Sequence, residues 1–535
     1  FTVIGFLGCQ LLGACFIPLD PDLPFARLEA TLVDSNSKMI IFNSQSKNHP
    51  LLSLLPNLDI QNSIQNQLLF NNHKPSPETI HMHSLAYMMF TSGSTGRPKG
   101  VQISNTAFAN ALMSFAKVPG VFENDIFASV TTLSFDISLA ELFTPLITGA
   151  TCYLVSKDTA RDGIALDRLI SKIHPSIMQA TPATWKLLRS VNSHHKQLQA
   201  WSGGEALSSE LAKWLLENFK SISNFYGPTE TTIWSTCKKI KSQDVNIGTP
   251  IDNTDIFLLD TLGLPVFPTC FGELLIGGLG LARGYANRPN LTSMAFTPHP
   301  IRHGDRIYHT GDQAFWNTNG EISIVGRIDR QLKIDGYRIE LEEIEALLKK
   351  FPLINDAVVA TKNINDSVML FAWVTSKSNE VIDQTTLRTY LKRFLPHYMI
   401  PRNIYAIKEF PLTPNGKIDV NALQADDLNV KPIVTSSINP LEKTILMIWM
   451  NVLKKANLTI DDDFIGAGGH SLIATQIRAK LEKIFKIEIP ITLIFNSRTV
   501  RELAREMTVN QGNGSNIMAL AEQFIHLASK KDRLN

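Results

Sequence analysis

Apolar runs alternate with amphipathic stretches along the chain and predict short strands followed by helices. Runs rich in Ile, Val and Met indicate buried strands, and apolar positions every three to four residues indicate helices. In the first half, the expected elements are strands at 39–42, 87–90, 151–155 and 177–180 and helices at 25–33, 106–117, 164–173, 183–190 and 210–217. Strands and helices that alternate with short connections predict a layered α/β domain.

The second half of the chain follows a different pattern. Short strands fill residues 245–325, a strand-strand-helix-strand order then predicts a small α+β unit, and three amphipathic helices after a polar segment predict an all-α bundle. The expected elements are strands at 357–361, 369–374 and 403–407 and helices at 387–394, 441–452, 472–485 and 500–507. Because 535 residues are too many for one core, we expect a multidomain α/β protein.

Composition and charge are those of an ordinary globular protein, with 44% hydrophobic and 19% charged residues. A net charge of +2 gives no reason to expect nucleic acid or an anionic membrane as a partner. Residues 1–18 are apolar, but Gln10 interrupts them and they are too short to span a bilayer. Five cysteines without a C-x-x-C pair favour buried thiols in a reducing compartment, so we expect a cytoplasmic protein.

A loop of small, hydroxylated and glycine residues follows the apolar run at 87–90. The loop consists of Thr91, Ser92, Gly93, Ser94, Thr95, Gly96, Arg97, Pro98, Lys99 and Gly100. Glycines let the backbone approach phosphate oxygens, hydroxyls donate hydrogen bonds, and Lys99 adds a positive charge. A P-loop does not fit, because Lys99 follows a proline and precedes a glycine. A flexible Gly/Ser linker is the other alternative, but linkers rarely follow a buried strand.

This loop resembles the phosphate-binding loop of the adenylate-forming enzymes, which include acyl-CoA ligases, luciferases and the adenylation domains of nonribosomal peptide synthetases. The resemblance implies a large adenylate-forming α/β core that binds ATP, with Lys99 among its catalytic residues. Residues 11–20 also resemble an early motif of the family, which normally lies well inside the domain. We therefore expect the core to be truncated at its N-terminus.

Two later loops fall at strand ends, where open α/β sheets usually bind ligands. In the loop at 224–232, Tyr226 offers a stacking face for adenine, Thr229 a donor to the α-phosphate, and Glu230 an oxygen ligand for Mg²⁺. The resemblance gives the same roles and assigns Asn224 to the adenine amino group. It also makes the other loop the opposite face of the adenine slot, formed by Gly203, Gly204 and Glu205.

The next motifs concern the ribose and a hinge. By resemblance Asp312 binds both ribose hydroxyls, although an aspartate after glycine is also common in ordinary turns. Residues 326–345 resemble the family's hinge and the start of its small domain, which implies a contact of Arg327 with the cofactor and a rotation about Asp329. The family usually has a basic residue where this chain has Asp335, and losing that charge weakens the expected phosphate or phosphopantetheine contacts.

Asp136 lies in an apolar stretch, where an unpaired carboxylate is costly. It should either cap a helix or meet a cation, and the two roles can coexist. By resemblance it pairs with the α-ammonium group of an amino acid. The pocket carried over from the family consists of Asp136, Ile137, Ala140, Gln179, Trp201, Gly203, Phe225, Ile233, Trp234 and Lys417. Three large aromatics and no charge between the two ends predict a small uncharged amino acid of the glycine or alanine class.

Two C-terminal motifs supply the remaining parts. A turn lysine such as Lys417 is usually a solvated charge, but in the family it reaches the substrate carboxylate and the α-phosphate. Residues 461–472 resemble the attachment site of peptidyl carrier domains, in which Ser471 takes 4′-phosphopantetheine. A helix cap is the alternative for Ser471, and it is compatible because helix N-termini favour phosphodiesters. The predicted domains are a core at 1–328, a small subdomain at 329–425, a linker at 426–438, a four-helix carrier domain at 439–508 and a tail at 509–535.

Together these motifs predict a nonribosomal peptide synthetase fragment that forms an aminoacyl-AMP and passes the aminoacyl group to the thiol on Ser471. Its expected partners are neighbouring synthetase modules or condensation domains and a phosphopantetheinyl transferase. An acyl-CoA ligase should lack Asp136 and the fused carrier, and a non-catalytic scaffold that only presents its carrier is a second alternative. His194 and His195 suggest a metal pair, but without further ligands nearby we expect them to be surface residues.

Overall fold

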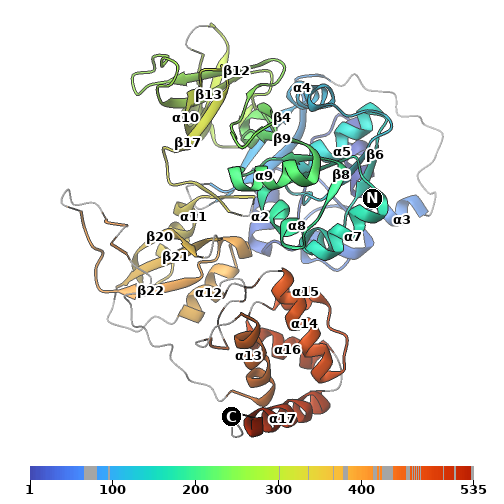
Figure 1. Ribbon diagram of the computed structural model, residues 1–535. Coiled ribbons are helices and arrows are strands. Elements are labelled where there is room, and N and C mark those ends of the chain that lie inside the picture. Colours follow the sequence, from blue (N-terminus) through green and yellow to red (C-terminus); the bar gives the residue numbers. More distant parts are fainter. Residues whose placement is uncertain are drawn as a thin grey trace.

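The computed structural model contains an α/β core, a small α+β subdomain and a helical bundle, arranged in chain order (Figure 1). This architecture confirms the fold class expected from the sequence. The residues that the structure describes are 1–65, 81–93, 97–299, 302–334, 336–364, 367–377, 384–413, 418–420, 422–423, 438–453, 458–460, 462, 464, 467, 469, 471–497, 499–510 and 514–531.

A seven-stranded sheet forms the centre of the core, in the order β11-β10-β9-β8-β7-β5-β6. The strands from β6 to β9 run parallel, and β10 and β11 are antiparallel at one edge. Their bounds are β5 (Ile126–Ser129), β6 (Thr151–Leu154), β7 (Ile177–Ala180), β8 (His195–Ser202), β9 (Phe219–Tyr226), β10 (Thr236–Ile240) and β11 (Thr249–Pro250). The continuous apolar runs of the sequence are therefore the inner strands of this sheet.

Helices cover both faces of the seven-stranded sheet. Trp185 and Leu211 pack on one face, and Phe115 and Leu142 belong to the core on the other. The helices of this layer are α4 (Asn105–Phe115), α5 (Ile137–Thr148), α6 (Lys157–Arg161), α7 (Gly163–Ile173), α8 (Pro182–Ser190) and α9 (Ser209–Asn218), with the π-helical turn η3 (Ala116–Gly120) after α4. Because the faces are covered, ligands have access at the carboxyl ends of β7, β8 and β9.

Two smaller sheets border these strand ends. In the three-stranded sheet β14-β4-β3, Thr91 lies directly opposite Lys99, so the two ends of the glycine-rich loop are held side by side. The five-stranded sheet has the order β12-β13-β16-β15, with β17 paired to β16. The bounds are β3 (Leu85–Thr91), β4 (Lys99–Ser104), β12 (Thr254–Leu259), β13 (Gly272–Gly278), β14 (Gly284–Tyr285), β15 (Phe296–Pro298), β16 (Arg306–Trp316) and β17 (Ile322–Arg327).

Shorter elements complete the core. Helix α2 and the parallel pair β1-β2 form a separate apolar cluster around Leu28 and Leu51. The elements are α1 (Thr2–Leu11), α2 (Phe25–Ser35), β1 (Ile40–Phe42), η1 (Ser44–Ser46), η2 (Pro50–Ser53), β2 (Asn57–Asp59), α3 (Ile60–Gln65), η4 (Thr229–Thr231) and α10 (Pro289–Ala295). The short helix η4 matters most here, because it follows β9 at the edge where the parallel strands end.

The small subdomain begins with a hairpin that reaches toward the core. Its three-stranded sheet has the order β20-β21-β22, and Ile344 and Leu348 of the following helix pack on it. The elements are β18 (Leu332–Ile334), β19 (Tyr337–Ile339), α11 (Leu341–Lys349), β20 (Ile354–Ile364), β21 (Ser367–Ser376), α12 (Gln384–Lys392), η5 (His397–Met399) and β22 (Asn403–Ile407). The tip of the β18-β19 hairpin lies against the core at the strand ends.

The carrier region is a helical bundle at the lower end of Figure 1. Helices α13 (Pro440–Leu453), α14 (Ser471–Phe485) and α16 (Val500–Asn510) lie where the sequence predicted them, and α15 (Ile491–Asn496) is a short helix at a position that was not predicted. A further helix, α17 (Gly514–Lys531), buries Ile517 and Ala521 in the same apolar cluster, and the Thr444 hydroxyl donates a hydrogen bond to the Ala521 carbonyl. The segment we expected to be a tail thus adds to the bundle core. Among all described helices, none is long and apolar enough to cross a membrane.

Candidate active site

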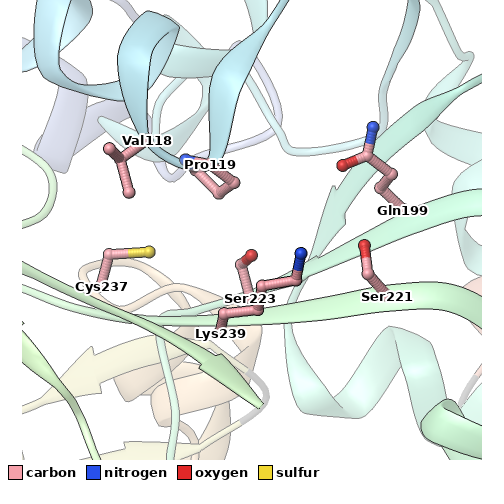
Figure 2. Close-up of a pocket in the computed structure, with 7 residues that line it drawn as sticks. All are labelled: Val118, Pro119, Gln199, Ser221, Ser223, Cys237 and Lys239. Atoms are coloured by element: carbon pink, nitrogen blue, oxygen red, sulfur yellow. The ribbon is translucent and has the colours of Figure 1, made fainter. Parts of the chain in front are cut away.

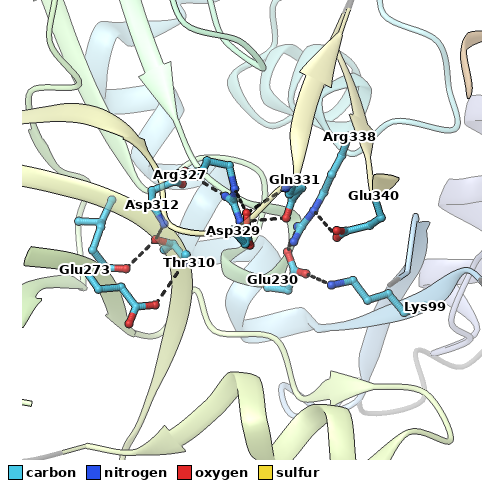
Figure 3. Close-up of polar contacts among 12 residues, drawn as sticks. Lys99, Glu230, Glu273, Thr310, Asp312, Arg327, Asp329, Gln331, Arg338 and Glu340 are labelled. Atoms are coloured by element: carbon cyan, nitrogen blue, oxygen red, sulfur yellow. Dashed lines mark hydrogen bonds and ion pairs between the residues drawn. The ribbon is translucent and has the colours of Figure 1, made fainter. Parts of the chain in front are cut away.

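A buried carboxylate, Glu230 of η4, lies at the centre of the site (Figure 3). Its Oε1 accepts a hydrogen bond from the Tyr285 hydroxyl at 2.8 Å and lies 3.1 Å from Lys99 Nζ. Its Oε2 lies 2.8 Å from an Arg338 guanidinium nitrogen. Burial alone would raise the pKa of Glu230, but Arg338, Lys99 and the tyrosine hydroxyl hold that pKa well below its usual range. The Glu230 carboxylate is therefore ionised and completely buried.

The Asp312 carboxylate is the second acidic group of the site. It lies on β16, where the Tyr226 hydroxyl donates to its Oδ2 at 2.5 Å and Arg327 donates to its Oδ1 at 2.9 Å. Arg327 also donates to Asp329 at 2.6 Å, in the predicted hinge, and to Gln331 at 3.0 Å (Figure 3). The predicted ribose-binding aspartate, adenine-stacking tyrosine and hinge are thus joined by direct contacts.

The predicted adenine slot lies between the ends of β8 and β9. The Asn224 amide nitrogen donates to the Asn246 carbonyl at 2.9 Å, and its buried Oδ1 has no hydrogen-bond partner in the described part of the chain. That oxygen is suited to accept a hydrogen bond from an exocyclic amine. Gly204 has a φ of +88°, a left-handed conformation that favours glycine. Glu205 accepts a hydrogen bond from the Gly336 backbone N–H at 2.5 Å, so the small subdomain closes this side.

Asp136 lies at the N-cap position of α5, but its side chain makes no capping hydrogen bond. Burial raises the pKa of Asp136 to about 6, although a hydrogen bond from Thr229 opposes that rise. Its Oδ2 has no hydrogen-bond partner among the residues that the structure describes. With Thr91, Thr229 and Arg338, Asp136 lines a narrow cavity of about 60 Å³. A buried carboxylate oxygen of this kind is suited to pair with a cation, while the Ile137 backbone N–H also lowers the pKa of this carboxyl.

The predicted pocket residues lie together in the core next to Asp136. Ile137, Ala140, Trp201, Phe225, Ile233 and Trp234 share one apolar cluster. The Phe225 and Trp234 rings stack with their centroids 4.2 Å apart. A Cβ at Gly203 would lie 2.9 Å from the Trp234 indole nitrogen, so only glycine fits. The buried Gln179 amide is bonded to Thr131, whose hydroxyl also contacts the buried Glu141.

A second cavity, of about 180 Å³, lies between η3 and the strands β8, β9 and β10 (Figure 2). Cys237 is the cross-strand partner of Phe225, and Ser223 lies two residues before Phe225 on the same face of the sheet. The lining consists of Val118, Pro119, Gln199, Ser221, Ser223, Cys237 and Lys239. Burial raises the pKa of the Cys237 thiol to about 12, so this thiol stays protonated. This cavity is therefore next to the strand position of Phe225.

The described ends of the glycine-rich loop contact the small subdomain. The Ser92 hydroxyl donates to the Arg338 carbonyl at 2.7 Å, and the Gly93 backbone N–H donates to Glu343 Oε2 at 3.3 Å. Glu343 also pairs with Arg27 of α2 at 2.9 Å. Several predicted residues fall outside the described residues: Ser94, Thr95, Gly96, Asp335, Lys417 and most of the linker at 426–438. Ser471 is the first residue of α14, so the predicted phosphopantetheine attachment residue stands at a helix N-terminus.

The histidine pair is not a metal site, and one expectation about it was wrong. His194 hydrogen-bonds to Asn218, as a surface residue would. His195, in contrast, is buried and its Nε2 lies 2.8 Å from Asp167, because β8 carries it into the core. Within the described ranges, no group of three or more His, Cys, Asp or Glu side chains could hold a metal ion.

Four residues of the site had no predicted role. Arg338, Lys333 and Glu343 come from the small subdomain, and Tyr285 comes from the short strand β14. The Lys333 ammonium lies over the Tyr226 ring, 5.6 Å from its centroid. Lys333 and Arg338 alternate with apolar residues along the hairpin, which was the available signal that they share a face.

Three family profiles match the chain. The AMP-binding enzyme family matches residues 1–286, the AMP-binding enzyme C-terminal domain matches 343–417, and the phosphopantetheine attachment site matches 443–507. The dimodular nonribosomal peptide synthase of Bacillus subtilis (strain 168) is 38% identical over 520 residues, which cover 95% of this chain and 22% of that protein. The chain thus spans less than a quarter of this relative's length.

Solved structures give the same result. A four-domain nonribosomal peptide synthetase bound to AMP and glycine is 34% identical, with a TM-score of 0.57 over 95% of this chain and 38% of that one. A nonribosomal peptide synthetase protein with adenylation and carrier domains shares the fold, with a TM-score of 0.74 at 24% identity over 94% of this chain and 85% of that one. Because the first profile covers more than half of its residues, the chain belongs to the AMP-binding enzyme family, and like the peptide synthetases it resembles it carries a phosphopantetheine attachment domain.

Proposed function

We propose that this chain activates a small amino acid with MgATP and transfers the aminoacyl group to a phosphopantetheine thiol on Ser471. The observation that carries this proposal is the convergence of Glu230, Asp312 and Asp136 on one edge of the core sheet. Thr229 hydrogen-bonds to Asp136 and directly precedes Glu230 in the chain. The hairpin at 332–339 connects Glu230 with Asp312, because its Arg338 pairs with Glu230 and its Lys333 lies over Tyr226 and is attracted by Asp312. The dimodular synthase of Bacillus subtilis is a much longer protein, so neighbouring modules or condensation domains are proposed partners.

In the first step, a carboxylate oxygen of the amino acid bonds to the α-phosphorus of ATP while the bond from that phosphorus to the pyrophosphate oxygen breaks. Two anions must meet, so charge neutralisation and positioning dominate the barrier. Glu230 fits as a ligand for Mg²⁺, which would neutralise phosphate charge, because its carboxylate is ionised and directly follows Thr229, which lines the cavity beside Asp136. Lys99, Thr229 and the loop at 91–96 supply the remaining donors, and Lys417 is proposed to act on the same oxygens.

In the second step, the thiol sulfur attacks the acyl carbon, the bond from that carbon to the phosphate oxygen breaks, and AMP leaves. The hairpin at 332–339 lies against the core in this structure, with Gly336 bonded to Glu205 and Tyr337 packed edge-on to Phe135 at 5.4 Å. This arrangement supports a small subdomain positioned for thioester formation, from which a rotation about Asp329 would return Lys417 for adenylation. The tether to the carrier keeps the thiol at high effective concentration.

The pocket supports a small side chain on the substrate. Trp201, Phe225 and Trp234 fill the space beyond Asp136, and their rings pack against one another. The synthetase structure at 34% identity was solved with glycine bound, which agrees with this choice. All five cysteines are free thiols, which supports a reducing, cytoplasmic setting.

Amino acid affinity should rise with pH between 5 and 7. The Asp136 pKa of about 6 leaves its carboxyl protonated at pH 5 and ionised at pH 7, and only the ionised form pairs with an ammonium group. The ionised fraction grows from roughly one tenth to roughly nine tenths, so KM for the amino acid should fall about ninefold. Pyrophosphate exchange measured against amino acid concentration at each pH tests this; a KM that stays flat would remove Asp136 as the ammonium partner.

The direct test of the function is intact mass of the full chain after incubation with a phosphopantetheinyl transferase, coenzyme A, MgATP and each amino acid. We expect one phosphopantetheine addition, absent in Ser471→Ala, followed by one aminoacyl addition for glycine or alanine. Loading by arginine or glutamate would refute the pocket assignment. ATP binding without pyrophosphate exchange would instead support a scaffold that only presents its carrier.

A further inference from the structure

The Asn224 amide, the predicted contact to adenine, is held in one orientation by a neighbouring loop. Its nitrogen donates to the Asn246 carbonyl at 2.9 Å, and its buried oxygen has no partner within the described ranges. Because a backbone carbonyl only accepts hydrogen bonds, the amide turns its NH₂ group toward Asn246 and its oxygen away from it. The opposite orientation would place two acceptor oxygens face to face in a buried site, where an unmade hydrogen bond is costly.

The Asn246 side chain fixes the loop that carries this carbonyl. Its oxygen accepts from the Gly248 backbone N–H at 2.8 Å, and its nitrogen donates to Glu321 at 3.0 Å. The loop backbone also bonds to the start of β17, with the Ile247 N–H donating to the Ile322 carbonyl at 2.9 Å. Asn246 is only 3% exposed, so water does not readily replace these partners. The position of the Asn246 carbonyl therefore depends on its own side chain and on Glu321.

Glu321 is held in turn by the strand that pairs with Asn224. Its carboxylate pairs with Lys238 of β10, and Lys238 is the cross-strand partner of Asn224 on β9. The hydrogen bond from Lys238 holds the pKa of Glu321 below its usual value, and the hydrogen bond from Asn246 acts in the same direction. Directly paired residues of antiparallel strands lie on one face of the sheet. Strand pairing and side-chain bonds thus connect these four residues in one closed network.

The orientation of the Asn224 amide decides which purine fits. Adenine carries an amino group at C6, which donates a hydrogen bond, whereas guanine and hypoxanthine carry a carbonyl at C6, which accepts one. An amide oxygen that faces C6 matches the amino group but meets the carbonyl as a second acceptor. A site built to bond one polar group discriminates strongly against an analogue that lacks this group.

We propose that Asn246 and Glu321 are positioning residues for nucleotide selection. Without touching the nucleotide, they hold the Asn224 amide with its oxygen toward C6 of the base, and so favour ATP over 6-oxopurine triphosphates. This inference rests on the proposed function, because it takes Asn224 as the contact to the base. It assigns a role to the loop at 246–248 and to the first turn of β17, which lie outside the predicted site.

Calorimetry of the full chain with MgATP and with magnesium inosine triphosphate tests this role. The two nucleotides differ only at C6 and the adjacent ring nitrogen, so the ratio of their Kd values reports the contact at C6. The unmodified protein should bind ATP more tightly. Asn246→Asp brings a second carboxylate to Glu321, and Glu321→Ala removes the acceptor of the bond. Each variant should lower the preference for ATP by about tenfold.

A rescue variant and a control separate this role from general loss of structure. The double change Asn246→Asp with Glu321→Gln exchanges the donor and the acceptor of the bond, so it should restore most of the preference, whereas independent effects would add. Asn110→Asp is the matched control. Asn110 is also buried and donates to a backbone carbonyl, that of Asp252 at 3.0 Å, and its replacement should leave the Kd ratio unchanged.

The outcomes distinguish this inference from the proposed function. An unchanged Kd ratio in Asn246→Asp and Glu321→Ala, no rescue by the double change, or equal binding of both nucleotides by the unmodified protein would overturn the inference alone. The expected ratios without pyrophosphate exchange would support it and contradict the proposed adenylation. If the unmodified protein does not bind ATP, both fail.

Discussion

Glu230→Gln should lower kcat for ATP-pyrophosphate exchange by roughly 10²- to 10³-fold, the usual cost of removing one preorganised electrostatic group from an active site. The change keeps the shape of the side chain but removes the negative charge that lies between the largely buried cations Lys99 and Arg338. Arg338 keeps only its more distant contact with Glu340, at 3.8 Å. Two buried cations then face a neutral amide, so we also expect a loss of about 3–5 kcal/mol in the free energy of unfolding. Exchange kinetics and chemical unfolding of the same preparation measure both effects.

Glu141→Gln is the matched control for Glu230→Gln. Glu141 is equally buried, but burial raises the pKa of its carboxyl to about 7 despite hydrogen bonds from Thr131 and Ser129. An amide imitates the protonated form, accepting from Ser129 and donating to the Thr131 hydroxyl. We therefore expect little change in stability or exchange at neutral pH. Equal losses of exchange rate and stability in the two variants would show that Glu230 acts only as a buried carboxyl. That result would contradict its proposed role as the metal ligand.

The sequence predicted those parts of the site that lie in short motifs, either within a strand or shortly after one. Asp136, Glu230 and Asp312 each stand in a short motif with a chemical reason for its residue types, and the structure brings these motifs to one edge of the sheet. The elements around them were predictable for a local reason, since periodicity and turn residues reflect burial of neighbours in the chain.

The contacts between domains could not be predicted in this way. Arg338 and Glu343 lie more than 100 residues from the groups they pair with, and a charged residue in a hinge motif looks like an ordinary solvated side chain. Their partners depend on how one domain is rotated on another, which no local pattern encodes. The helix α17 was uncertain for a related reason, because only its packing on α13 shows that its apolar face is buried.

The second large effect concerns the opposite end of the substrate. Asp136→Asn should lower kcat/KM for the amino acid by roughly 10²- to 10³-fold, since a desolvated charge pair lost at one partner costs about 3–5 kcal/mol. For the matching carboxylic acid without the amino group, kcat/KM should change little in this variant. The ratio of the two kcat/KM values, which measures the preference for an amino group, should therefore fall. Pyrophosphate exchange with both acids measures this ratio.

The free energy of unfolding should rise in Asp136→Asn although the activity falls. A variant that gains stability while it loses activity identifies Asp136 as a functional residue. Because the pKa of Asp136 is raised by burial from 3.8 to about 6, its carboxyl contributes most to stability at low pH, and this contribution is lost as pH rises through 6. At pH 8 the ionised form costs the folded chain about 3 kcal/mol, a cost that the neutral amide removes. Asp162→Asn is the control, because Asp162 caps α7 through Ile164 and asparagine caps as well. Asp162→Asn should change neither kcat/KM nor the free energy of unfolding. An Asp136→Asn variant that loses both activity and stability would instead make Asp136 a structural residue.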